Sequence, residues 1–174
     1  KELLYSLTGY RNLESPDLTG LEALVLEANQ REAHYETHVA HELRGNILSL
    51  FRATPWPSEA FRKLTARTSH DLAAGWLADG YENKARLSAR SSLTSFKTYS
   101  IDKTRHSPPI REIFKQEASK LKSQAKLRLR IESDAPGILY VNGDQLGDYN
   151  ERWEILLSKG EYRVWVQSEM GWSF

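Results

Sequence analysis

Cysteine is absent from the 174 residues of this chain, and methionine occurs once. The absence of cysteine excludes disulfide bonds, cysteine nucleophiles and thiolate metal sites. No apolar run approaches the roughly 20 residues that a helix needs to cross a bilayer, so the sequence contains no transmembrane segment. An initiator methionine and a signal sequence are also missing. We therefore expect the native N-terminus, with any export signal or membrane anchor, to precede Lys1.

The sequence also lacks the motifs that announce common catalytic sites. It contains no phosphate-binding loop, no dinucleotide fingerprint, no nucleophile elbow and no paired metal motif. His70-Asp71 and His106 stand isolated, and we interpret them as capping or surface residues. The sequence therefore favours a protein that is not an enzyme and that carries no cofactor.

The hydrophobic periodicity of the first 125 residues is typical of helices. The chain is 40% hydrophobic and 27% charged, a composition that suits one or two ordinary domains with a core. Apolar residues recur at helical spacing, and prolines and glycines mark the ends of the segments. A helix interruption at Gly45 is compatible with the pattern. The predicted helices cover residues 17–53, 58–64, 69–78, 82–99 and 107–123.

At Lys126 the pattern changes to strand alternation. Leu127, Leu129 and Ile131 alternate with charged residues, and Asn142-Gly143 is a strong signal for a tight hairpin. The chain is therefore predicted to be α+β, with an all-helical, repeat-like region at 1–125 and a small antiparallel, β-sandwich-like module at 126–174. The predicted strands cover residues 127–132, 138–141, 154–157 and 162–167.

Three histidines, His34, His38 and His41, follow one another at spacings of four and three residues. On one continuous helix they share a face that points away from the apolar stripe. Neutral imidazoles one turn apart can hold zinc or nickel, so this face is a weak metal candidate beside the alternative of a solvated surface. The segment 41–44 also resembles the phosphoacceptor box of a histidine kinase, but the chain has no ATP-binding segment, so we reject that interpretation.

The segment from Leu127 to Trp172 resembles the PEGA domain, a small β module of bacterial surface and envelope proteins. About 46 residues are covered, and the resemblance departs after Gly147, where the family often has Thr-Pro. A preceding joint, YSID at 99–102 and SPPIREIFKQEA at 107–118, is similar to the one that links such modules to tetratricopeptide-like helices. The matching segments are SDAPGI at 133–138, YVNG at 140–143, LG at 146–147, LSKGEYRVWV at 157–166 and GW at 171–172.

This resemblance implies a non-catalytic protein of the bacterial envelope, in the periplasm or associated with the outer membrane. Its role would be that of a scaffold or binding module for peptidoglycan, a surface glycan or a protein partner. It also implies a further strand after Phe174, so that the module would be truncated here. The resemblance supplies no ligand and no functional residues.

Tryptophans of the β module are the leading candidates for contact with such a partner, because flat aromatic faces bind sugars and proteins. The candidates are Trp153, Trp165 and Trp172. Trp165 lies between Val164 and Val166, so alternation predicts that it points outward if the valines are buried.

Charge is distributed unevenly along a chain whose net charge is only +1. Residues 84–130 contain thirteen basic and three acidic residues, whereas residues 131–174 contain three basic and eight acidic ones. The alternative hypothesis is that this basic tract binds an anionic polymer or membrane surface. Nucleic acid is disfavoured, because the tract lacks interleaved aromatics for base stacking. The candidate contacts are Lys84, Arg90, Lys97, Arg111 and Lys115.

Overall fold

The computed structural model describes residues 3–7, 18–54, 58–169 and 171–173, and for 3–7, 53 and 171–173 it describes the backbone alone. The chain divides into two compact units. The helical unit comprises Ser15–Lys120, and the β unit combines Lys1–Glu14 with Leu121–Phe174. The prediction of an α+β protein, with helices first and a small sheet second, is confirmed.

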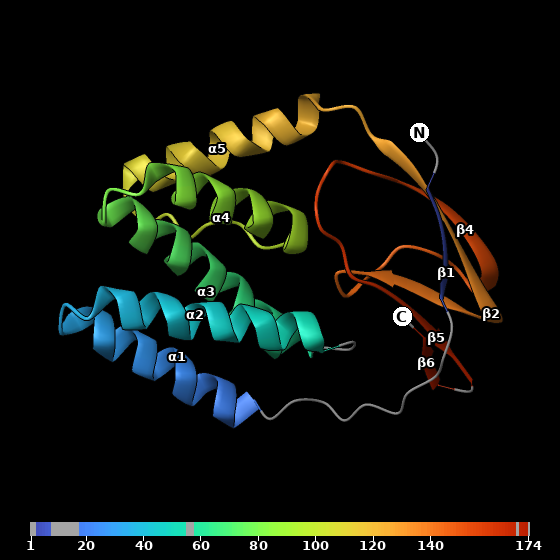
Figure 1. Ribbon diagram of the computed structural model, residues 1–174, viewed down its shortest axis with the longest axis horizontal. Coiled ribbons are helices and arrows are strands. Elements are labelled where there is room, and N and C mark those ends of the chain that lie inside the picture. The colour runs from blue at the N-terminus through green and yellow to red at the C-terminus, as the bar shows by residue number, and fades with distance from the viewer. Residues whose placement is uncertain (1–2, 8–17, 55–57, 170, 174) are drawn as a thin grey trace. The chain divides into compact units, whose positions relative to one another are not determined.

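Five helices occur in the described residues, and the first four form two hairpins (Figure 1). In the first hairpin α1 packs on α2, in the second α3 packs on α4, and α2 joins them by packing on α3. The side chain of Ser58 caps α3 by accepting a hydrogen bond from the backbone N–H of Phe61 at 3.2 Å. The helices are α1 (Leu18–Ala33), α2 (Thr37–Ala53), α3 (Glu59–Ala78), α4 (Glu82–Ser95) and α5 (Pro108–Ser123).

Two apolar clusters stabilise the helical unit. One surrounds Phe51, whose ring centroid lies 4.7 Å from that of Phe96 and 6.2 Å from that of Phe61. The other joins α3 and α4 to α5 through small alanines and through Ile110 and Phe114. The alanines let the helices approach closely, so larger polar groups of α3 are buried alongside them.

The helix predicted over residues 17–53 is wrong in one important respect. It is broken at His34–Glu36, and not at Gly45, because Tyr35 adopts a left-handed conformation with φ of 63°. The break changes which residues face the core, so Val39 and Leu50, expected in the apolar stripe, are 37% and 47% exposed. The two helices predicted at 58–64 and 69–78 are instead the single helix α3.

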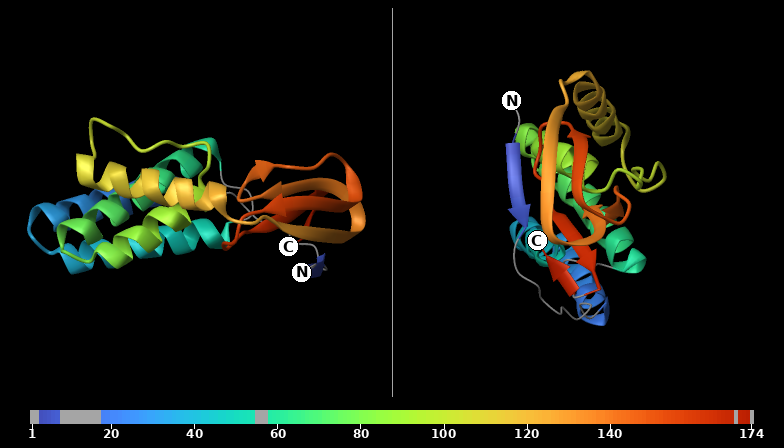
Figure 2. Two further views of the ribbon diagram at one scale, coloured as in Figure 1. Left: turned by 90° about the horizontal axis from the view of Figure 1, so that it is seen from above. Right: turned by 90° about the vertical axis from the view of Figure 1, so that its right-hand side faces the viewer.

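The β unit is organised around one long strand, β2 (Leu127–Val141), which bends along its length (Figure 2). Its register shifts between Glu132 and Gly137, so the strands predicted separately at 127–132 and 138–141 are one continuous strand with a bulge. The first half of β2 pairs antiparallel with β4 (Asn150–Leu157), and the second half with β5 (Val164–Ser168), which pairs with β6 (Gly171–Ser173). Because of the bulge, β2 pairs with β4 along its first half and with β5 along its second half.

The predicted hairpin at Asn142-Gly143 is confirmed. Both residues have positive φ, 54° and 86°, as a two-residue turn between right-twisted strands requires. This turn connects β2 to the short strand β3 (Asp144–Gln145).

The strand β1 (Leu3–Leu7) departs from the expectation that the first 125 residues are helical. It pairs in parallel with the first half of β2, from Leu3 opposite Leu129 to Leu7 opposite Ser133. Local periodicity cannot reveal this pairing, because its partner lies more than 120 residues along the chain.

The tryptophan predicted to point outward is part of the core of the β unit. Trp165 and Trp153 are each 7% exposed, and Trp153 packs with Ile131, Leu139 and Val166. The indole N–H of Trp153 donates to the carbonyl of Asp148 at 2.9 Å. Val164 and Val166 pack in one apolar cluster that does not include Trp165, so alternation holds along β5, but the side of the strand that carries Trp165 is covered as well.

Candidate functional site

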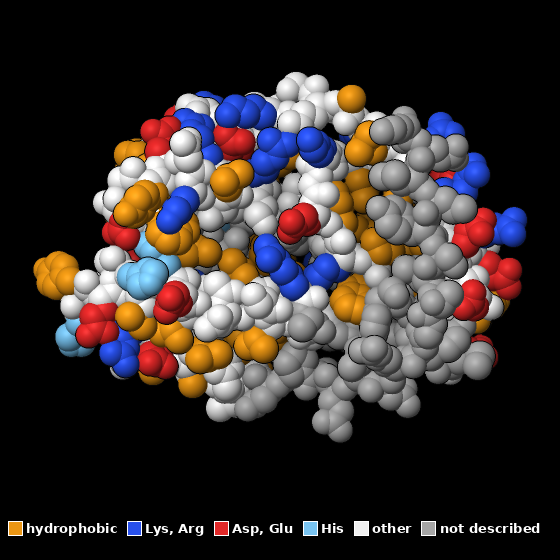
Figure 3. Space-filling view, in the orientation of Figure 1, with side chains coloured by type: hydrophobic (Ala, Val, Ile, Leu, Met, Phe, Trp, Pro, Cys, Tyr) orange, Lys and Arg blue, Asp and Glu red, His pale blue; other side chains and the backbone are white. Residues whose placement is uncertain are grey.

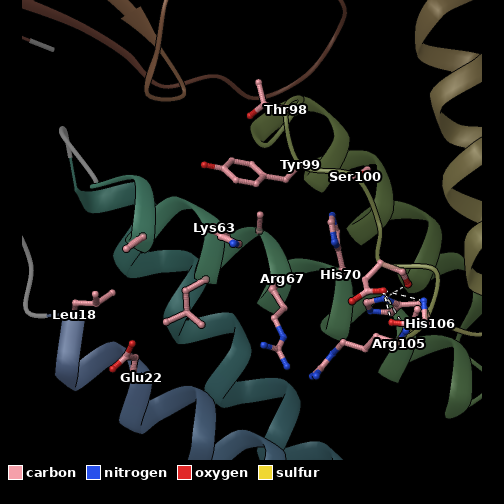
Figure 4. A pocket seen from close by; sticks show the side chains of 15 residues that line it. Leu18, Glu22, Lys63, Arg67, His70, Thr98, Tyr99, Ser100, Arg105 and His106 are labelled. Atoms are coloured by element: carbon pink, nitrogen blue, oxygen red, sulfur yellow. Dashed lines mark hydrogen bonds between the residues drawn. The ribbon is translucent and has the colours of Figure 1, made fainter.

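A polar pocket of about 790 Å³ opens in the helical unit (Figure 4). Residues of α1, α3 and the segment 98–106 between α4 and α5 line it. On α3, Lys63, Arg67 and His70 share one stripe, because residues four and three positions apart lie on the same side of a helix. Glu22 of α1 and Arg105 of the loop complete the charged lining.

Behind this lining, a buried carboxylate joins α3 to the loop that precedes α5. Asp71 is 8% exposed and accepts two hydrogen bonds from Arg105, from Nε at 2.9 Å and from Nη2 at 2.7 Å. His106 contacts the same carboxylate, with Nε2 at 3.1 Å from Oδ1. Burial opposes ionisation of Asp71, but the hydrogen bonds from His106 and Arg105 outweigh it and lower its pKa to about 2.

The loop presents Arg105 and His106 by means of a local turn at Asp102. The Oδ1 of Asp102 accepts hydrogen bonds from the backbone N–H of Thr104 at 2.8 Å and from its hydroxyl at 2.7 Å. These contacts hold the pKa of Asp102 below its ordinary value. A side chain that bonds its own backbone two residues on fixes a turn without regular secondary structure.

Both ring nitrogens of His106 face acceptors. Nδ1 lies 3.1 Å from the carbonyl oxygen of Asp102, and Nε2 lies 3.1 Å from Oδ1 of Asp71. A carbonyl and an ionised carboxylate only accept hydrogen bonds. The two contacts are therefore simultaneous hydrogen bonds only when each ring nitrogen carries a proton.

His70 lies beside this cluster in a different state. It is 5% exposed, lines the pocket, and packs edge-on against Phe114 and His106. It makes no hydrogen bond with any residue that the structure describes. Burial, followed by the charge on His106, lowers its pKa to about 4, so the ring is neutral near pH 7. A neutral imidazole offers one donor and one acceptor.

A second buried polar group fastens α2 to α1. Arg44 is 2% exposed, and its guanidinium donates to both carboxylate oxygens of Glu32, at 2.9 and 2.7 Å. The Arg44 hydrogen bonds lower the pKa of Glu32. Because the guanidinium of Arg44 is engaged in this bidentate pair, we assign Arg44 a structural role.

The three predicted histidines do not share an exposed face. His34 and His38 are exposed, but His41 is 4% exposed and its ring lies 4.0 Å from that of Trp76. The prediction assumed one continuous helix. The break at Tyr35 changes the helical phase, so His41 lies on a different face from the one predicted. Within the described ranges there is no group of three or more His, Cys, Asp or Glu residues placed to hold a metal ion.

The three tryptophans predicted to contact a partner are not exposed as a group. Trp153 and Trp165 are core residues and present no face to a partner. The side chain of Trp172 lies outside the part of the chain that the structure describes.

Part of the basic tract is paired with acidic side chains. Lys115 approaches Glu112 at 3.8 Å, and Arg130 donates to Glu154 at 2.7 Å. Lys84 lies 4.1 Å above the ring of Trp76 and 4.6 Å from that of Tyr81. Over α5, Figure 3 shows acidic side chains between the basic ones. Arg90 and Arg111 are half-buried, whereas Lys97 is exposed. The tract also spans both units, so its members do not form one surface within either of them.

Sequence reasoning missed the pocket residues because their contacts are remote in sequence. Asp71 meets Arg105 and His106 across 34 and 35 residues. The interpretation of His70, Asp71 and His106 as capping or surface residues is wrong, since all three are buried. The available signal was local: a polar pair inside an otherwise amphipathic helix.

Comparison with known proteins identifies no relatives. No protein-family model matches the chain, and neither the curated proteins nor the solved structures contain a significant match. No helix among the described residues combines the length and apolarity needed to cross a membrane.

Proposed function

We propose that this chain is a non-catalytic binding protein of the bacterial envelope whose helical unit binds its ligand in the polar pocket. The observation that carries the proposal is His70. His70 is 5% exposed and makes no hydrogen bond with the described residues, and because it lines the pocket its ring nitrogens are available to a ligand there. It lines a pocket in which Lys63 and Arg67 are exposed. A bound ligand would supply a hydrogen-bond partner.

The two pocket histidines are poorly suited to acid–base catalysis. A general base works best with a pKa near the working pH, and the pKa of His70 is about 4. His106 contacts an acceptor at each nitrogen. These features support binding without turnover.

The envelope assignment rests on the resemblance of the β unit to the PEGA domain. Two glycines of that pattern stand where no side chain fits. A Cβ on Gly137 would lie 2.4 Å from the carbonyl oxygen of Gln167, and one on Gly147 would lie 2.4 Å from Cδ1 of Trp153. The pattern therefore corresponds to steric requirements of this sheet, which supports the resemblance and the wall-associated role that it implies.

Co-sedimentation with purified peptidoglycan sacculi, at low and high salt, tests the proposal. We expect the full chain to pellet, with pelleting reduced in Arg67→Gln and unchanged in Lys115→Gln. The control removes another exposed cation, whose ammonium lies 3.8 Å from Glu112. Absence of pelleting at low salt would refute the wall-binding role. Pelleting that disappears with salt and is equally weakened by both variants would favour the basic tract as an anionic-polymer site.

A further inference from the structure

We infer that the ligand of this pocket presents a carboxylate, which Arg67 and Lys63 bind together with the free Nη1 of Arg105. The inference rests on the proposed function in that it names the ligand chemistry of the same pocket. It is carried by the placement of three cations, two imidazoles and two carboxylates around a single cavity.

Lys63 and Arg67 differ from several basic residues of the helical unit. Arg31, Arg44 and Arg86 each pair with at least one carboxylate. Lys63 and Arg67 form no ion pair with any of the described residues, although they lie one turn apart on α3 and both line the pocket. Two adjacent cations without a counter-charge repel each other, and an anion bound between them removes that repulsion.

Arg105 adds a fixed donor. Its Nε and Nη2 are held by the two oxygens of Asp71, which leaves Nη1 without a hydrogen bond among the described residues. In Figure 4 the side chains of Arg67 and Arg105 extend toward the same part of the pocket. Because Asp71 and the turn at Asp102 orient Arg105, this donor is positioned before a ligand arrives.

The lining holds charges of both signs in similar number, which disfavours a highly charged anion. Glu22 and Asp102 also line the pocket, and Asp71 lies behind it against Arg105. These carboxylates offset much of the positive charge of Lys63, Arg67 and Arg105. A phosphate monoester carries nearly two charges near neutral pH and would be repelled more strongly than a carboxylate. Planar carboxylates also match the fork of a guanidinium.

His70 gives the pocket a neutral donor. Its pKa of about 4 keeps the ring uncharged near pH 7. One ring N–H can donate to a carboxylate oxygen, while the other nitrogen accepts from a ligand amide or hydroxyl. Carboxylates with neighbouring amides occur in acidic peptides, which is the ligand class that this lining fits.

The test uses the full chain with sodium acetate as the carboxylate probe and inorganic phosphate as the competing anion, at matched ionic strength. Long-range ¹H–¹⁵N NMR spectra report the ring nitrogens of His70 directly. We expect the His70 signals to move with added acetate until binding is saturated. We also expect acetate to bind with a lower dissociation constant than phosphate. Arg67→Gln should weaken acetate binding about tenfold or more, since it removes a charged hydrogen-bond donor. Lys115→Gln should leave the binding unchanged.

Three outcomes would overturn the inference: His70 signals that acetate does not move, tighter binding of phosphate than of acetate, or equal acetate affinity in Arg67→Gln. Failure here is separable from failure of the proposed function. Sacculi that pellet the chain without any effect of acetate would leave wall binding intact and refute the carboxylate site. Acetate binding without pelleting would do the reverse.

Discussion

Nε2 of His106 lies 3.1 Å from Oδ1 of Asp71, a residue 35 positions earlier in the chain. This contact and the bidentate pair of Asp71 with Arg105 fasten the loop after α4 to the middle of α3. The same carboxylate thus stabilises the fold and orients one wall of the pocket. Its removal should affect both.

Asp71→Asn is expected to lower the free energy of unfolding by about 3 kcal/mol, because a neutral amide leaves the guanidinium of Arg105 without its counter-charge and weakens the contact with His106. Chemical denaturation followed by far-UV circular dichroism measures the loss. Glu112→Gln is the matched control, since its pairing with Lys115 is exposed on both sides. It should change stability by less than about 1 kcal/mol. Equal stabilities of the two variants would show that the Asp71 cluster contributes nothing net.

Acidification should destabilise the protein through His70. Its pKa is about 4 in the folded chain and ordinarily 6.5, so between these values the unfolded chain binds more protons. The contribution of the neutral His70 ring to the free energy of unfolding is therefore fully present above pH 6.5 and is lost as the pH falls toward 4. Over this whole pH range, the free energy of unfolding should fall by about 3 kcal/mol through His70.

His70→Gln removes this titration and is the natural comparison. Unfolding free energies of both proteins, measured by urea denaturation near neutral pH and in mild acid, should diverge: the original chain loses more on acidification. Asp71 contributes its own loss only at lower pH, as the pH falls from its ordinary 3.8 through about 2. A parallel decline of the two proteins between pH 6.5 and 4 would contradict the assigned state of His70.

Two glycines with opposite surroundings offer a packing test in the helical unit. In Gly75→Ala the new Cβ would lie 2.4 Å from Nε2 of His41, a ring held against Trp76. We expect a cost of about 1–3 kcal/mol. In Gly45→Ala the Cβ meets nothing within 4 Å, so helix propensity should stabilise α2 by up to about 1 kcal/mol. Thermal unfolding midpoints should therefore move in opposite directions, and a shared direction would contradict the described packing of His41.

Local sequence signals predicted the elements that local physics determines. Periodicity separated the helices from the strands, Ser58 marked the start of α3, and Asn142-Gly143 marked a hairpin. Tyr35 carries no such signal: a bulky residue in the left-handed region is unfavourable by itself, yet it lies at the break between α1 and α2, which pack on each other. The parallel pairing of β1 is likewise a matter of tertiary contacts.

The candidate site was less predictable than the fold for the same reason. Each pocket residue on α3 looks ordinary in sequence, and Lys63 and Arg67 resemble the solvated side of any helix. Their role depends on Arg105, which a turn at Asp102 brings back to α3. Spacing in sequence cannot show this, whereas the polar pair His70-Asp71 within a helix was the local sign of a buried polar cluster.

The last prediction concerns Trp165, which the alternation of its strand assigned to a partner and the structure assigns to the core. Trp165→Ala should remove a side chain that is 7% exposed and cost about 3–5 kcal/mol. Amide hydrogen exchange locates the effect: Leu139 and Tyr140, which pair with Val166 and Trp165, should lose protection, while the amides of α3 should keep theirs. Leu156→Ala is the control, because that side chain is 59% exposed and its loss should be nearly neutral. If Trp165→Ala instead kept the protection of both strands and abolished pelleting with sacculi, the indole would be a contact residue, and its burial in the isolated chain would have to give way on binding.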